Sequence, residues 1–108
     1  MRYRNFHQHL VDAVLCTPGA TSESLRRAVL ERAEQQPGAQ PDLAPAVAHY
    51  VDTVARHAYK VTDADVTALQ QDGHSDDDIF EITVAAAVGA AMHRLTRGLA
   101  ALRDEEPE

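Results

Sequence analysis

The sequence predicts an all-α protein: a compact bundle of about five helices with a long C-terminal alanine-rich helix. Apolar residues recur every three or four positions, alanine is abundant, and no alternating run of β-branched residues indicates a strand. A chain of 108 residues has the length of one domain, and 44% apolar residues suffice for one core. We expect a single helical domain over residues 1–103 and an acidic disordered tail over 104–108.

The first two helices are expected at residues 4–15 and 22–36. The first has an apolar stripe with a spacing of four residues between Phe6 and Val14, and a proline and a glycine follow it. The second has Ser22 as its N-cap candidate and ends at a proline–glycine pair. The Pro-, Gly- and Gln-rich segment 36–41 resembles a linker but is too short to separate domains.

The third helix is expected at residues 42–59, with Asp42 as its N-cap candidate. Its apolar positions are spaced by three or four residues, which predicts one buried face. That stripe consists of Leu43, Val47, Tyr50, Val54 and the pair His57/Ala58.

The last two helices are expected after two capping residues, Thr62 and Ser75. Thr62 forms a capping box with Asp65, and Gly73 suits the end of that helix. Ser75 begins the longest helix, residues 76–102, whose three initial aspartates suit a helix N-terminus. Its heptad-like stripe consists of Val84, Val88, Ala91, Leu95, Gly98/Leu99 and Leu102. Because its middle is almost free of bulky side chains, we expect a central helix that a second subunit covers.

Charge and hydropathy exclude several classes of protein. The formal net charge is −7, and all of this excess lies in residues 59–108, which argues against nucleic acid and anionic membrane as partners. The N-terminal residues lack the apolar core of a signal peptide, so we expect a cytoplasmic protein. Nine arginines against one lysine fit a GC-rich bacterial genome.

No cofactor or metal site is predicted. A single cysteine, Cys16, excludes an internal disulfide and zinc sites built on several thiolates. The six histidines include no pair at i, i+3 or i, i+4, the spacing that helical metal sites use. Three consecutive aspartates after Ser75 point to different sides of a helix, so an N-terminal cap explains them better than a metal.

The second half of the chain is similar to the carboxymuconolactone decarboxylase / alkylhydroperoxidase D-like superfamily. The similar segments are Tyr59-Lys60-Val61-Thr62-Asp63-Ala64-Asp65-Val66, Gly73-His74-Ser75 through Ile82, and the alanine-rich run Ala85–Ala91. The resemblance implies an all-α fold and an obligate homo-oligomer, often a trimer or hexamer. Its Cys-x-x-Cys-x-x-x-His motif would fall on Ala58, Val61 and Asp65, so the thiol chemistry is missing. Of the Tyr-x-Gly-x-Pro pattern of decarboxylase members, only Gly89 is present.

Three residues are therefore the candidates for a shared pocket: Tyr50, His57 and Asp65. His57 is a weak catalytic candidate, as a general base toward a carbon acid, against the alternative of a structural histidine. Two functions follow. The chain is either a degenerate, non-thiol family member that binds or transforms a small organic acid or lactone, or a non-enzymatic interaction or assembly module. The first needs a pocket with convergent polar groups, and the second needs an exposed apolar patch.

Overall fold

A computed structural model describes the backbone of residues 2–35 and 42–104, and the side chains of residues 5–35 and 42–102. Within these ranges the chain is all-helical, as predicted, with five α-helices and one short 3-10 turn. They are α1 (Arg2–Cys16), α2 (Glu23–Glu34), α3 (Pro45–His57), η1 (Ala58–Lys60), α4 (Asp63–Gln71) and α5 (Asp76–Asp104). The linker-like segment 36–41 and residues 105–108 of the expected tail lie outside the described residues.

Three of the predicted helix starts and one predicted helix end are confirmed. The Ser22 hydroxyl accepts a hydrogen bond from the Leu25 N–H and caps α2, and Thr62 forms the predicted capping box with Asp65. Ser75 and Asp78 exchange backbone-to-side-chain bonds at the start of α5 in the same way. Gly73 ends α4 with a φ of +95°, a conformation that glycine adopts at little cost.

The predicted start of α3 is wrong. The helix begins three residues later, at Pro45, and its N-cap is Ala44, which has no side chain to cap with. Proline at the first helical position replaces the capping interaction as the start signal, since its fixed φ suits a helix and its missing N–H leaves no donor unpaired. The helix also ends at His57, where a 3-10 turn takes over.

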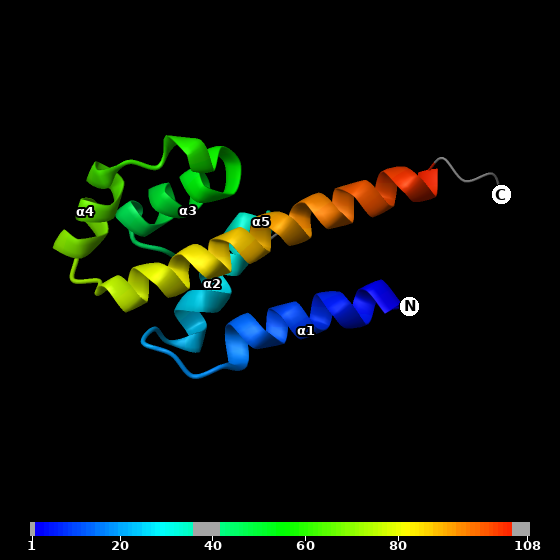
Figure 1. Cartoon of the computed structure of the whole chain (residues 1–108), viewed down its shortest axis with the longest axis horizontal. Helices are drawn as coiled ribbons and strands as arrows, with labels where there is room; N and C mark the ends of the chain where they lie inside the picture. The colour runs from blue at the N-terminus through cyan, green and yellow to red at the C-terminus, as the bar shows by residue number, and fades with distance from the viewer. Residues whose placement is uncertain (1, 36–41, 105–108) are drawn as a thin grey trace.

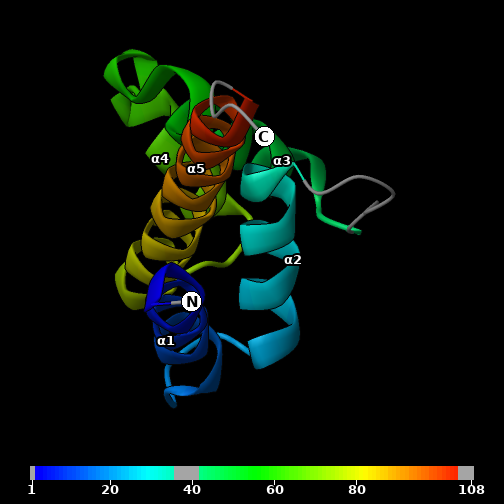
Figure 2. The ribbon, with the colours of Figure 1, turned by 90° about the vertical axis from the view of Figure 1, so that its right-hand side faces the viewer.

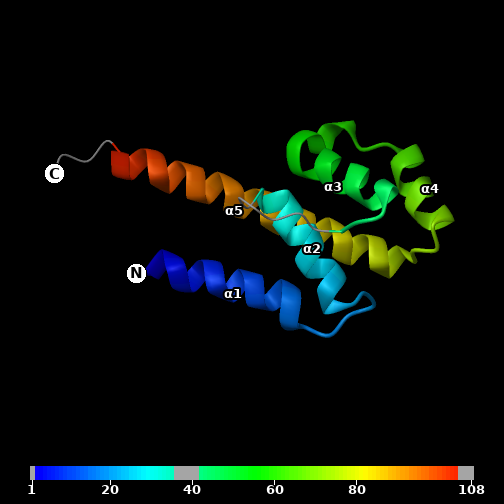
Figure 3. The ribbon, with the colours of Figure 1, turned by 180° about the vertical axis from the view of Figure 1, so that it is seen from behind.

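α5 is the central helix of the fold, and the others cover only part of it. α2 crosses behind α5, α3 and α4 pack beside its first half, and α1 runs alongside it (Figure 1). The view along the molecule shows α2 on one side of α5 and, within the described part of the chain, no helix on the opposite side, between α1 and α4 (Figure 2). The C-terminal half of α5 extends away from the α3–α4 end of the molecule, toward the end where α1 begins (Figure 3).

The core lies where α2, α3 and α4 meet one face of α5. Its α5 residues are Ile79, Ile82, Ala85, Ala86 and Ala90. The heptad-like residues that the sequence singled out lie on other faces: Val88, Leu95 and Leu99 are half-buried, Ala91 and Gly98 are exposed, and Val84 and Leu102 are 36% and 56% exposed. Three alanines and two isoleucines of α5 therefore face the core, whereas Phe80, Val84 and Leu102 lie outside it.

Candidate functional site

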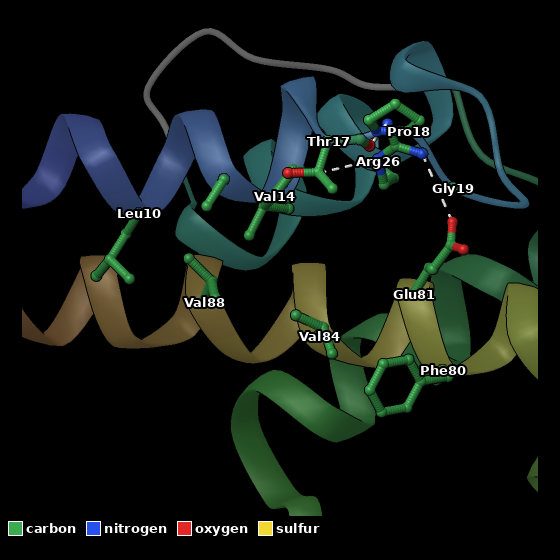
Figure 4. Close-up of a pocket in the computed structure, with 11 residues that line it drawn as sticks. Leu10, Val14, Thr17, Pro18, Gly19, Arg26, Phe80, Glu81, Val84 and Val88 are labelled. Atoms are coloured by element: carbon green, nitrogen blue, oxygen red, sulfur yellow. Dashed lines mark hydrogen bonds and ion pairs between the residues drawn. The ribbon is translucent and has the colours of Figure 1, made fainter.

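An apolar groove of about 360 Å³ separates α1 from the first half of α5 (Figure 4). Leu10, Ala13 and Val14 form its α1 wall, and Val84 and Val88 form its α5 wall. The side chains of Leu10 and Val88 extend toward each other across it. A concave apolar surface of this kind binds other apolar surface by excluding water.

Arg26 closes one end of the groove and holds the α1–α2 loop. It is the one charged residue among the described side chains that is buried, at 6% exposure. Its guanidinium donates to the carbonyl oxygens of Val14, Leu15, Thr17 and Thr21 over 2.5–3.0 Å. The last carbonyls of a helix have no partner within the helix, so Arg26 supplies the hydrogen-bond donors for the carbonyls in the last turn of α1.

Glu81 of α5 joins the same loop from the other side. Its carboxylate accepts hydrogen bonds from the Ala20 N–H at 2.6 Å, the Thr21 N–H at 2.9 Å and the Thr21 hydroxyl at 2.5 Å. The Arg26 Nη1 lies 3.5 Å from its Oε1. These hydrogen bonds, those of Thr21 first, lower the pKa of Glu81 from 4.5 to about 2.

The groove therefore has two charged groups at its end, but neither is available for acid–base chemistry. Glu81 stays ionised at neutral pH, and its oxygens are directed at the loop. Arg26 uses its donors on four backbone carbonyls. A general acid or base needs a pKa near the working pH and access to substrate. The groove offers apolar surface without such a group among its lining residues.

An uncovered apolar stripe continues this groove along the outward face of α5. Phe80 is 68% exposed, Val84 36% and Leu102 56%, and Ala87 and Ala91 are exposed between them. Phe6 of α1 is also exposed, at 57%. We call this surface the α1–α5 face, made of Phe6, Leu10, Ala13, Phe80, Val84, Ala87, Val88, Ala91, Leu95 and Leu102.

A second cavity, of about 290 Å³, lies between α1 and α2 and is more polar. His7 and Glu34 approach each other there, with 3.5 Å between Nε2 and Oε1. Among the described side chains, no group of three His, Cys, Asp or Glu residues is arranged to hold a metal ion.

The three residues expected to share a pocket lie apart from both cavities. Tyr50 is buried, and its hydroxyl lies 2.7 Å from the Thr83 hydroxyl. His57 is exposed, not at the edge of a buried stripe, and packs against the Tyr59 ring edge-on at 6.0 Å. Asp65 caps α4 and lies 3.5 Å from the His49 imidazole. None of the three lines either cavity, and a catalytic role for His57 stays a prediction.

Comparison of the chain with family models, curated proteins and solved structures finds no match. The resemblance to the carboxymuconolactone decarboxylase-like superfamily therefore stays a prediction. The fold class that it implied is confirmed by the helices themselves.

The Arg26–Glu81 pair was missed by the sequence reasoning. Arg26 stands beside a second arginine, Arg27, and the sequence alone does not distinguish the buried arginine from the exposed one. A signal for Glu81 was present, because this carboxylate interrupts the apolar run between Phe80 and Ile82. A charge within the most apolar helix of a chain usually has a defined partner.

Proposed function

We propose that this protein is a non-enzymatic assembly module that associates with further copies of itself through the α1–α5 face. One observation carries the proposal: the outward side of α5 keeps an apolar stripe from Phe80 to Leu102 in water, while its core residues lie on the other side. Contiguous exposed apolar surface of this kind marks interaction sites in soluble proteins.

The exposed side chains support association more than ligand turnover. Phe80 is the most exposed large apolar side chain of this face, and an aromatic ring that leaves water on binding is a typical anchor of a protein interface. The charged groups beside the groove are occupied by the α1–α2 loop, so nothing among them converges on a bound organic acid. The assembly hypothesis is therefore favoured over a lyase or decarboxylase.

A membrane is the competing occupant of this face. Residues Asp76–Leu102 are long and apolar enough by composition to cross a bilayer, although 39% of their most apolar stretch is buried inside the protein. The core helix of a soluble bundle has the same properties, and α5 supplies five residues to the core of this one. The three aspartates at its start and the net charge of −7 disfavour anionic lipid.

Sedimentation velocity tests the proposal with a matched pair of variants. Phe80→Glu places a charge on the α1–α5 face, and Tyr59→Glu replaces an aromatic residue that is 80% exposed in η1, away from α5. We expect the wild type and Tyr59→Glu to sediment as oligomers and Phe80→Glu as a monomer with unchanged helix content.

Two outcomes overturn the proposal. One is a wild type that stays monomeric at its highest soluble concentration. The other is a monomer that co-sediments with phosphatidylcholine vesicles and loses this binding in Phe80→Glu, which assigns the face to membrane.

A further inference from the structure

The charges of α5 are separated along its length. Its first six residues contain Asp76, Asp77, Asp78 and Glu81, and no acidic residue occurs again before Asp104. The basic residues between them are Arg94, Arg97 and Arg103. The helix therefore carries its negative charges in its first six residues and its positive charges in its C-terminal half. Of these groups, Glu81 is held by the α1–α2 loop and Arg94 donates to the Ala55 carbonyl oxygen at 3.2 Å, so the remaining charges are those of Asp76, Asp77, Asp78, Arg97 and Arg103.

We infer that two copies pair with their α5 helices antiparallel across the α1–α5 face. This inference rests on the self-association proposed above and adds its orientation. An antiparallel pair places the acidic start of each helix beside the arginines of the other, whereas a parallel pair places like charges together. The helix dipoles favour the same arrangement.

The crossing point follows from the same pattern. Matching residues 76–81 of one copy with residues 94–103 of the other puts the two-fold axis close to Ala87–Ala91. Ala87 and Ala91 are exposed, and their short side chains let the two backbones approach closely. Phe80 of each copy then lies beyond the crossing, near Leu95 to Gly98 of the other.

The size of the surface indicates that α1 takes part. The stripe from Phe80 to Leu102 is about 34 Å long and about 10 Å wide, which is about 340 Å² per copy. A specific interface needs about 500 Å² or more from each partner. The side of α1 that carries Phe6, Leu10 and Ala13 is about 12 Å long, adds about 120 Å² and brings the total to about 460 Å², close to this threshold. Each copy therefore contributes the α1–α5 pair to a four-helix bundle.

Distances between nitroxide spin labels test the orientation. Asp77 and Ala101 are exposed and lie near opposite ends of the stripe, so a label on either leaves its centre intact. Each is replaced by cysteine in a Cys16→Ser background, because the native Cys16 is exposed. We expect label separations of about 30–40 Å in each singly labelled homodimer. In a mixed dimer of the two variants, we expect a separation under about 20 Å.

Two other outcomes separate the failure of the orientation from the failure of self-association. Short distances in both homodimers and a long one in the mixed dimer overturn the antiparallel arrangement but leave self-association intact. The absence of dipolar coupling in all three samples, with monomers in sedimentation, overturns both the inference and the proposed function.

Discussion

Gly89 of α5 crosses Leu30 of α2 so closely that a β-carbon at position 89 would lie 2.5 Å from the Leu30 carbonyl oxygen. The same β-carbon would lie 2.8 Å from that of Ala33. Since α2 makes the most extensive contact with α5, this crossing fixes how the two helices pack. Glycine is required here because the neighbour is backbone, which cannot rotate away as a side chain can.

We expect Gly89→Ala to destabilise the fold by about 1–3 kcal/mol, the usual range for overpacking, despite the better helix propensity of alanine. Gly98→Ala is the control, because a β-carbon there would meet nothing within 4 Å. It is expected to stabilise by up to about 1 kcal/mol. Urea unfolding measures the stability of both variants, and a Phe80→Glu background separates folding from association. Equal effects of Gly89→Ala and Gly98→Ala on stability would contradict the close crossing of α2 and α5.

Arg26→Met is expected to cost about 3 kcal/mol of stability, because it leaves the carbonyls at the end of α1 without donors. The neighbouring Arg27 provides the comparison, since it forms an exposed pair with Glu23 at 3.2 Å. Arg27→Met should change stability by about 0.5 kcal/mol or less. If thermal unfolding gave the two variants the same midpoint, Arg26 would not be the residue that ends α1.

The depressed pKa of Glu81 predicts a loss of stability in acid. Because its pKa is about 2 in the folded protein and 4.5 ordinarily, its contribution is complete above about pH 4.5 and declines as the pH falls toward 2. Glu81→Gln is expected to lower the free energy of unfolding by about 2 kcal/mol at pH 7 and by less at pH 3. Urea unfolding of the wild type and of Glu81→Gln between pH 3 and pH 7 measures this difference. If the stability of the two proteins changed with pH in parallel, the role of Glu81 would be contradicted.

The antiparallel pairing predicts that salt weakens association. Arg97 is exposed in the basic part of α5, and Arg97→Glu should raise the dissociation constant and reduce its salt dependence. Arg56→Glu, at an exposed position of α3, makes the same change in net charge and should leave both unchanged. Sedimentation equilibrium from low to high salt makes the comparison, and stronger association of Arg97→Glu would argue for the opposite orientation.

Tyr50 and His57 should respond differently to truncation. Tyr50→Phe removes a buried hydroxyl that pairs with Thr83 and should cost about 1 kcal/mol. His57→Ala removes an exposed ring and should change stability by no more than about 0.5 kcal/mol. If His57→Ala also leaves binding and turnover of small organic acids and lactones unchanged, the catalytic role suggested for His57 is wrong.

The helices of this fold could be predicted because their start and stop signals are local. Ser22, Thr62 and Ser75 each cap with a residue three positions later, so a short stretch of sequence contains the whole interaction. The start of α3 was mistaken because a proline at the first helical position competed with an acidic cap candidate.

The interaction surface was harder to predict, because the sequence does not say which side of α5 the other helices cover. Ile82 and Val84 are equally good core residues by composition, but Ile82 is fully buried and Val84 is exposed. Which of the two is buried depends on where α2 packs. α2 packs on the side of α5 that carries Gly89, because the two helices cross there too closely for a β-carbon. The larger residues of the heptad-like stripe remain on the other sides.

The two charged groups at the end of the groove have different consequences for the order of folding. The hydrogen bonds of Arg26 join residues 5–12 positions apart, so they close small loops and can form early. Those of Glu81 bridge 60 or 61 positions and must wait for α5. The α1–α2 hairpin is therefore expected to form before α5 docks on it. The face proposed for assembly is completed only by that last step, which keeps partly folded chains from associating through it.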